Sequence, residues 1–557
     1  MATKNSPNSE ALNLRKARGA FFTPRILCDF ISLWAVRSRN DKILEPSCGE
    51  ANFLLSVGSL LRSCSSKSDL SSQLFGVEIH QTSSLEAQRL LADAGFQSTI
   101  VNKDFFDVPP QPIYDAVVGN PPFVRYQDFF GTARTKGLQA ALAQGVRLNL
   151  LANSWAAFVV HAAQFLKPEG RLGLVLPAEL LTVKYAAQVR RFLLNRFSSI
   201  KLVMFEELVF PNVLEEVVLL LAEGSGSTSG FELFQARNVE DLRAINTHSW
   251  SRYYPEGSDK WTPALIPSEA LNVYRQVLDD KQVETLLDWG ESSLGIVTGN
   301  NKYFTISAKQ LTQHHVSRED CLAISPPGSR HLRGLTFTAK AWNELVAKDE
   351  SCYLFHPKPN ADSRTNDEYI KLGESAGVHQ GYKCRIRKTW WRVPIVPVPD
   401  LFLTYMDHTC PRLITNEARV HHLNSLYGVK LKKDRRVLGC DLLPLASLNS
   451  LTLLGAEIIG RSYGGGILKL EPTEADRLPF PSKALLESAA EDLRVLRPQL
   501  AMALREGDIK KVIKAVDNTL LKKHLRLRPT ELESLRTARE ILFKRRTGRG
   551  RKSRGEN

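Results

Sequence analysis

Short runs that favour β-strands alternate with helical stretches between residues 42 and 205, and this alternation constrains the fold more than any other feature. Strands separated by helices are typical of an α/β, doubly wound sheet whose strands are mainly parallel. The sequence therefore predicts a Rossmann-like first domain. The predicted strands lie at residues 43–44, 74–77, 99–101, 113–118, 171–175 and 200–204.

Two further segments complete this predicted domain, which we place at residues 1–245. Between the fourth and fifth strands, Asn153 or Ser154 can cap a helix that the sequence "KPEG" at residues 167–170 would end. Residues 215–237 hold two apolar runs around a Gly/Ser-rich loop. This pattern predicts a β-hairpin that closes the sheet.

The remainder of the chain has a different rhythm. Residues 246–481 alternate irregular short strands with loops rich in Pro, Gly, Trp and basic residues, which predicts a mixed α+β second domain. Helical periodicity returns at residues 482–543. Residues 544–557 are basic and lack apolar side chains to bury, so we expect a disordered tail.

Composition narrows the class of partner. The chain has 74 Lys and Arg against 59 Asp and Glu, a formal charge of +15, which makes a polyanion the first partner to consider. The longest apolar runs are too short to span a bilayer, and the polar N-terminus lacks a signal-peptide core, so we expect a cytoplasmic protein without membrane contact. The eight cysteines are scattered, so neither disulfides nor a metal site is expected.

Polar side chains follow the first four predicted strands, where ligands of open α/β sheets bind. Glu45 is followed by a turn of small residues that a ligand can approach closely. Glu78 can accept hydrogen bonds from both hydroxyls of a ribose. Asp104 can accept from an exocyclic amine, with Phe105 covering a purine face, and Asn120 ends the fourth strand. Together they indicate a cofactor that carries a nucleoside.

The charge of this set selects among such cofactors. Three acids would repel a pyrophosphate, and the first turn has neither G-x-G-x-x-G nor a P-loop lysine. S-adenosylmethionine suits the acids because its sulfonium and ammonium groups are cationic. Each acid also has a purely structural explanation: Glu45 as a helix-start device, Glu78 as a solvated carboxylate, and Asp104 as an N-cap with core aromatics behind it.

The stretch "GNPPF" at residues 119–123 gives the fourth strand an abrupt end, since proline supplies no backbone donor. The Asn120 side-chain oxygen and the Pro121 carbonyl can accept both hydrogens of an exocyclic amine, which favours its nucleophilic form. Pro122 keeps that carbonyl rigid, and Phe123 can stack on a base. A plain Asn-Pro turn is the alternative interpretation of the motif taken alone.

These residues resemble the gamma class of S-adenosylmethionine-dependent DNA adenine-N6 methyltransferases, as found in type II restriction-modification systems. "GAFFTP", "EPSCGEANF", "GVEI", "DFF" and "NPPF" follow one another in the order of that class. The resemblance implies the catalytic residues Asn120, Pro121, Pro122 and Phe123. It implies that the cofactor is bound by Phe22, Thr23, Glu45, Ser47, Cys48, Gly49, Glu78, Ile79, Asp104, Phe105 and Asn120.

The resemblance also implies a reaction. A target adenine is flipped out of double-stranded DNA, contacted by Phe123 and, from another side, by Phe210, and methylated at N6 without a metal. The enzyme would work as a monomer in a prokaryotic cytoplasm. It would protect host DNA from a cognate restriction endonuclease without an obligatory complex. Two departures from the family pattern are Ala51, where a second glycine is usual, and Phe123, where tyrosine is commoner.

The second domain is the predicted reader of DNA sequence, because it mixes cations with aromatic residues. For any single residue, a solvated face or a core tryptophan is the alternative. The predicted DNA contacts are Lys302, Arg385, Arg387, Trp390, Arg461 and Tyr463.

Other functions remain open at this stage. N-P-P-[FY] also serves methyltransferases that act on an RNA guanine or on a protein glutamine, although these are usually smaller. A modification subunit that needs a separate specificity protein usually has a long helical domain before the cofactor loop, and only about 40 residues precede it here. A catalytically silent DNA-binding module or a fused nuclease is less consistent with the residues.

Overall fold

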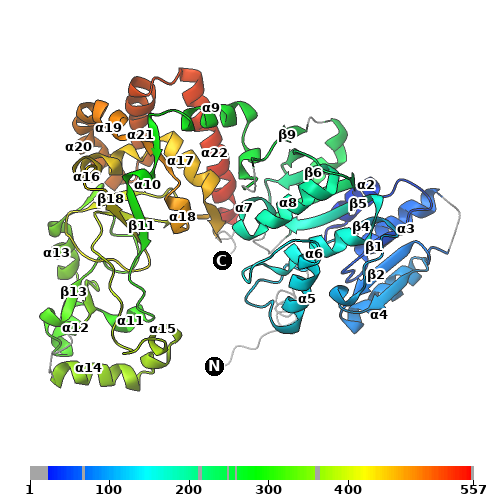
Figure 1. Ribbon diagram of the computed structural model, residues 1–557, viewed down its shortest axis with the longest axis horizontal. Helices are drawn as coiled ribbons and strands as arrows, with labels where there is room; N and C mark the ends of the chain where they lie inside the picture. The colour runs from blue at the N-terminus through cyan, green and yellow to red at the C-terminus, as the bar shows by residue number, and fades with distance from the viewer. Residues whose placement is uncertain are drawn as a thin grey trace. The chain divides into compact units, whose positions relative to one another are not determined.

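The computed structural model describes residues 23–64, 69–210, 216–247, 250–256, 260–357, 364–463 and 465–552 (Figure 1). The chain divides into two compact units, Met1–Leu265 and Ile266–Asn557. The division follows Leu265 and not residue 245, because strand β9 (Ser251–Tyr253) still pairs with the first unit's sheet. Trp261 also packs on Phe231 there, with ring centroids 4.5 Å apart.

In the described residues, the first unit is built on a nine-stranded sheet of order β3-β2-β1-β4-β5-β7-β6-β8-β9 (Figure 1). The pairs β3-β2, β2-β1, β1-β4 and β4-β5 are parallel, as expected of the α/β class. All six predicted strands are present. The strands are β1 Ile43–Glu45, β2 Leu74–Glu78, β3 Thr99–Asn102, β4 Tyr114–Gly119, β5 Leu166–Pro177, β6 Phe197–Phe205, β7 Val217–Ser225, β8 Phe231–Ala236 and β9.

The predicted hairpin at residues 215–237 is wrong. β7 lies between β5 and β6 and is antiparallel to both, whereas β8 pairs with β6 in parallel. The reason is burial: the β7 side chains from Val217 to Ala222 are all buried, so the strand needs neighbours on both edges and cover on both faces.

The predicted helix before β5 is shorter than expected. It comprises α6 (Ser154–Ala162) and a 3-10 turn that ends at Phe165, and β5 begins at Leu166. Residues 167–170 therefore lie in the strand. The pairing of β4 with β5 shifts register between Tyr114 and Ala116, and such an irregularity tolerates the proline at position 168.

Several helices pack against the strands of this sheet. α2 lies on β4 and β5, where Gly173 permits a close approach: a Cβ there would lie 2.6 Å from Ile31. The helices of this unit are α2 Arg25–Ala35, α3 Asn52–Cys64, α4 Gln81–Asp93, α5 Gly131–Leu142, α6, α7 Glu179–Thr182 and α8 Ala187–Arg196.

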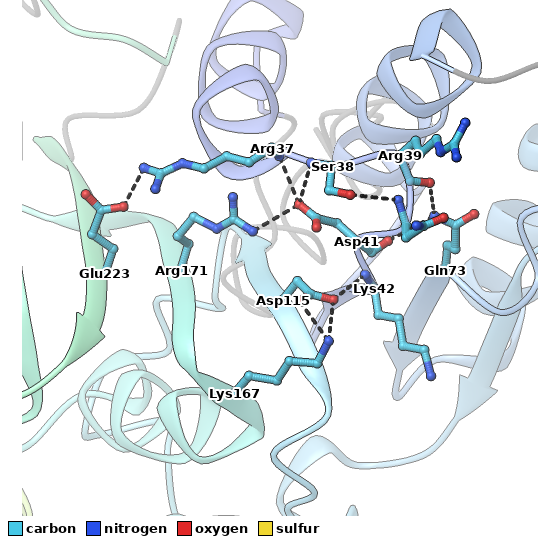
Figure 2. A network of polar contacts seen from close by, with 11 residues as sticks. Arg37, Ser38, Arg39, Asp41, Lys42, Gln73, Asp115, Lys167, Arg171 and Glu223 are labelled. Carbon is cyan, nitrogen blue, oxygen red and sulfur yellow. Dashed lines mark hydrogen bonds and ion pairs between the residues drawn. The ribbon is translucent and has the colours of Figure 1, made fainter.

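A polar network fastens the amino ends of the central strands (Figure 2). Arg171 on β5 donates to the Asp41 carboxylate over 2.9 Å, and both side chains are under 10% exposed, at 6% and 8%. The backbone nitrogens of Arg37 and Ser38 donate to the same carboxylate. Removing one partner of a buried pair costs about 3–5 kcal/mol, so this network fixes the strands at one edge while their carboxyl ends remain for ligands.

The second unit is α+β, as predicted. Its described strands form sheets of order β11-β19-β16-β18-β14, β12-β15-β13, β17-β21-β20 and β10-β22. The strands are β10 Val283–Thr285, β11 Gly290–Leu294, β12 Thr305–Ile306, β13 Cys321–Ala323, β14 Thr336–Phe337, β15 Tyr353–Phe355, β16 Leu401–Leu403, β17 Met406–Asp407, β18 Leu413–Asn416, β19 Tyr427–Leu431, β20 Arg461–Tyr463, β21 Ile467–Lys469 and β22 Pro479–Pro481.

Helices connect these sheets and then gather at the C-terminal end of the unit. Within the part of the chain that the structure describes, no single helix is long and apolar enough to cross a membrane; α16 and α17 pass that test only as a pair bent by 83°. The helices are α9 Ser268–Leu278, α10 Leu286–Trp289, α11 Asn301–Phe304, α12 Ala308–Gln313, α13 Ala339–Ala347, α14 Arg364–Ser375, α15 Tyr382–Arg385, α16 Arg436–Ala446, α17 Ser450–Ile459, α18 Pro472–Ala475, α19 Lys483–Ser488, α20 Ala490–Glu506, α21 Ile509–Val516 and α22 Pro529–Lys552.

The C-terminal segments are not separate from this unit. α22 packs against α9 and α17 and continues to Lys552, so the predicted disordered tail is wrong for residues 544–552. Arg546 explains the difference: it is 3% exposed and pairs with Glu457 over 2.6 Å. It also donates to the carbonyl of His408. Because these charge-assisted hydrogen bonds hold the Arg546 side chain in a buried position, they order the part of the chain around it.

Candidate active site

The turn after β1 is organised by Glu45. Its side chain is 3% exposed, and its Oε2 accepts a hydrogen bond from the Leu54 nitrogen over 3.2 Å at the start of α3. Burial raises the pKa of Glu45 well above its ordinary value, and the charge of Glu78 adds to that rise. The carboxyl group is thus a helix-start device, as one interpretation of the sequence held, and it lies beside a second carboxylate.

Glu78 connects the ends of β1 and β2. One oxygen accepts from the Gly49 nitrogen over 3.0 Å, and the other accepts from the His80 nitrogen over 2.9 Å. The carboxylate is 7% exposed, so it is not the solvated group of the alternative interpretation. Two backbone donors fix its orientation at the carboxyl end of β2. Ile79 follows it with a side chain that is 58% exposed.

The turn itself uses left-handed backbone at two residues. Gly49 has φ of 50°, and Ala51 has φ of 58°. Glycine adopts this region freely, whereas alanine pays about 1–2 kcal/mol for it. Ala51 therefore adopts the left-handed backbone at the position where the resemblance led us to expect a second glycine. Between them and β1, Cys48 is buried, and burial raises the pKa of its thiol.

Asp104 and Phe105 follow the end of β3. Asp104 accepts a hydrogen bond from the Phe106 nitrogen over 3.0 Å and caps a short 3-10 helix, Phe105–Asp107. The Phe105 ring is 3% exposed and stacks on Phe165, with centroids 5.1 Å apart. The ring thus packs in the core, while the Asp104 side chain stays 20% exposed beside Lys136. The predicted contacts of both residues with the cofactor stay predictions.

Asn120 lies where β4 ends. Its side-chain nitrogen donates to Oγ1 of Thr23 over 3.1 Å, and its side-chain oxygen is buried without a hydrogen-bond partner. A buried, unsatisfied amide oxygen costs about 1–3 kcal/mol, and native proteins keep few of them. The unpaired oxygen therefore indicates a place for a donor that arrives with a ligand.

The backbone of the Asn-Pro-Pro turn is held at both ends. Ser47 donates to the Asn120 carbonyl over 3.3 Å, and Ser154 on α6 donates to the Pro122 carbonyl. Among the described residues, no hydrogen bond reaches the carbonyl of Pro121 between them. The turn thus offers two acceptors, the Asn120 side chain and the Pro121 carbonyl, in a rigid frame.

The aromatic residues assigned to the target base are both enclosed. Phe123 is 9% exposed and Phe210 is 3% exposed. Thr23, the cofactor candidate before α2, is 9% exposed. Phe22 lies outside the described residues, so its predicted contact with the cofactor stays a prediction.

Comparison with known proteins finds a family model that matches each unit. Residues 8–234 match the family model described as N-6 DNA Methylase. The first unit is therefore similar to the N-6 DNA methylase family over these residues. Residues 258–521 match the model described as the C-terminal domain of type II methyltransferase M.Eco57I. The two matches follow the two units of the structure.

Curated relatives of this methylase extend over most of the chain. Type II methyltransferase M.AccI of Acinetobacter calcoaceticus is 22% identical over 93% of this chain and 95% of its own. Type II methyltransferase M.XamI of Xanthomonas campestris pv. amaranthicola is 23% identical over 83% of this chain and 85% of its own. A cryo-EM structure of a DrdV–DNA complex shares the fold, with a TM-score of 0.51 at 10% identity, over 88% of this chain and 58% of that one.

The predicted DNA contacts of the second unit separate into two groups. Arg387 donates to the carbonyls of Val297 and Thr298 over 2.7 and 2.8 Å, so its charge holds a loop. Trp390 donates to Glu374 and packs on the core, and Arg461 pairs with Glu474 over 3.3 Å. These three side chains therefore have partners within the unit, and their DNA contacts stay a prediction.

The other three remain available to DNA. Lys302 and Arg385 are exposed, and Tyr463 is 59% exposed with the Lys469 ammonium over its ring. Exposure and positive charge are what a phosphate contact requires, so their DNA role stays a prediction.

Sequence reasoning missed the hydrogen bonds that support the Asn-Pro-Pro turn. Asn153 and Ser154 were expected only as helix caps, yet Asn153 accepts from the Tyr126 nitrogen over 2.8 Å and donates to Glu179 over 2.8 Å. Glu179 also accepts from Trp155 over 3.2 Å. The only signal for these hydrogen bonds in the sequence is that Asn153, Ser154 and Trp155 are adjacent. Their partners are distant along the chain.

Proposed function

We propose that this methylase transfers the methyl group of S-adenosylmethionine to N6 of an adenine that is flipped out of double-stranded DNA. The observation that carries the proposal is the buried, unpaired side-chain oxygen of Asn120 next to the Pro121 carbonyl. An exocyclic amine has two hydrogens, and two acceptors fixed in one turn match them. The order of its motifs supports our assignment of the enzyme to the gamma class.

The residues at the strand ends fit the cofactor. Glu78 is oriented by two backbone donors and can accept from ribose hydroxyls, and Asp104 remains partly exposed for an amine. Acidic groups suit a cationic sulfonium and disfavour a pyrophosphate. When bound, S-adenosylmethionine supplies an electrophilic methyl carbon whose bond to sulfur breaks as the bond to N6 forms, and the sulfur keeps the electron pair.

The protein side of the reaction is positioning. Hydrogen bonds from N6 to Asn120 and to the Pro121 carbonyl draw the nitrogen lone pair out of the ring and toward the methyl carbon. The proton that N6 then loses goes to water. Phe123 and Phe210 would offset the unstacking of the adenine, since stacking is worth about 1–3 kcal/mol per base.

The wider role follows from the same proposal. We expect the modified DNA to be protected from a cognate restriction endonuclease, and we expect the methylase to act as a monomer without a stable complex with that nuclease. The exposed cations Lys302 and Arg385 would add affinity for the phosphate backbone.

The test is methyl transfer from labelled S-adenosylmethionine to duplex DNA, followed by nucleoside analysis. N6-methyladenine is expected; 5-methylcytosine, N4-methylcytosine, or label in RNA or protein would contradict the proposal. Asn120→Ala should retain cofactor binding and lose transfer by a factor of about 100 or more. Asn40→Ala, an exposed asparagine before β1, is the matched control.

A further inference from the structure

The loop that follows the catalytic turn, residues 124–130, exposes two aromatic rings. Phe130 is 69% exposed and Tyr126 is 37% exposed, whereas Phe123 and Phe129 on either side of Tyr126 are 9% and 6% exposed. An exposed phenylalanine ring forgoes the free energy that burial of its apolar surface would provide. Its exposed position therefore suggests a functional role.

The loop is held rigidly. The Tyr126 nitrogen donates to Asn153, and the Arg134 guanidinium donates to the carbonyls of Phe129 and Tyr126. Phe129 is packed under α5 so tightly that a Cβ on Gly137 would lie 3.0 Å from its ring. The exposed ring of Phe130 is therefore presented by an ordered frame, which lowers the entropic cost of binding.

The same frame carries the catalytic turn. Ser154 bonds both the Pro122 carbonyl and the Val124 nitrogen, the latter over 3.0 Å. The Ser154 side chain thus fixes the position of the exposed loop relative to the acceptors at Asn120 and Pro121. The exposed loop is therefore tied to the turn that carries the two acceptors.

A duplex from which an adenine has been extruded has a gap in its stack. Proteins that open DNA insert apolar side chains between base steps and gain stacking in return. We propose that Phe130, with Tyr126 beside it, enters the DNA stack at the position that the target adenine leaves. Arg125, exposed on the same loop, provides charge complementarity to the adjacent phosphates. This inference rests on the proposed function.

The experiment compares Phe130→Ala with the wild-type methylase, after sequencing of wild-type product has given the methylated site. On matched duplex, Phe130→Ala should transfer methyl groups about 5- to 100-fold more slowly, because one stacking contact is lost. On a duplex with a mismatch opposite the target adenine, which is already unstacked, the variant should approach the wild-type rate. Phe130→Trp should keep most activity on both.

Leu33→Ala is the matched control, since Leu33 is 67% exposed on α2 of the same unit. It should transfer at the wild-type rate on both duplexes. 2-Aminopurine at the target position should brighten with wild-type protein and brighten less with Phe130→Ala.

Three results would overturn the inference. Phe130→Ala could match the wild type on the matched duplex, or its defect could be equal on matched and mismatched DNA. If the wild-type enzyme methylates no adenine, the proposed function fails first, and this inference fails with it. The first two results leave the proposed function intact, so the two failures are distinguishable.

Discussion

The side-chain nitrogen of Asn120 donates to Oγ1 of Thr23 over 3.1 Å, and this contact leaves the amide oxygen as the unpaired atom. Thr23 comes just before α2, whereas Asn120 follows β4, so a residue at the entry to α2 orients the side chain that follows the fourth strand. The amide would otherwise be free to rotate by half a turn and present donors to an amine.

Thr23→Val removes that acceptor while it keeps the shape of the side chain. We expect kcat to fall about 3- to 10-fold, which corresponds to the loss of one hydrogen bond. KM for DNA should change little. Thr23→Ser should restore the rate. Steady-state kinetics on duplex DNA measure both parameters, and a Thr23→Ser variant as slow as Thr23→Val would contradict this role.

Ala51 is expected to tolerate glycine unusually well. Ala51→Gly and Ala87→Gly each delete a fully buried methyl group, but Ala51 has φ of 58° and Ala87 lies within α4. The first change relieves about 1–2 kcal/mol of backbone strain, and the second costs about 1 kcal/mol of helix propensity. Urea unfolding should find Ala51→Gly the more stable variant by about 2 kcal/mol. Equal losses would refute the argument.

The buried pair Arg171–Asp41 should dominate the stability of the amino edge of the sheet (Figure 2). Asp41→Asn leaves the Arg171 charge buried and should lower the free energy of unfolding by about 3–5 kcal/mol. Arg89→Gln breaks an exposed pair with Glu86 and should cost under about 1 kcal/mol. Denaturant melts of the two variants check the contrast, and similar losses would count against it.

Glu45 should make stability depend on pH. Its folded-state pKa is raised by burial above the ordinary 4.5, so the folded protein holds this proton more tightly than the unfolded chain. The stabilisation is complete below that ordinary value and declines as pH rises toward the folded pKa. Glu45→Gln cannot ionise. Its melting temperature should therefore fall less than that of the wild type between about pH 4 and neutrality. Parallel curves would disprove the assignment.

The sequence predicted the site best where local rules apply. Parallel strands end at one edge of a sheet, so Glu45, Glu78 and Asn120 could be placed together without coordinates. Their hydrogen bonds to Leu54, Gly49 and Thr23 could not be predicted from the sequence. Each depends on a residue that is remote in sequence or on the conformation of a turn.

Long-range burial decided the features that the sequence did not predict. β7 has the pattern of a hairpin strand. It lies between β5 and β6 because both of its faces are apolar and are buried there. Phe105, which was expected to cover a purine face, also packs in an aromatic cluster of the core that the sequence did not predict. Arg546 was predicted to lie in a disordered tail. Its partner Glu457 is far away along the chain, so no local pattern in the sequence indicates the ion pair.

Two arginines of the second unit should separate a structural role from a DNA-binding role. Arg387→Ala removes the donors to Val297 and Thr298 and should lower the free energy of unfolding by about 1.5–3 kcal/mol. Arg385→Ala, two residues earlier and exposed, should leave the melting temperature unchanged. It should weaken binding to all duplexes alike and reduce the slope of log K against log salt by about 1. Fluorescence anisotropy over a salt series measures that slope, and thermal melts measure stability. An unchanged slope for Arg385→Ala would remove this residue from the DNA interface.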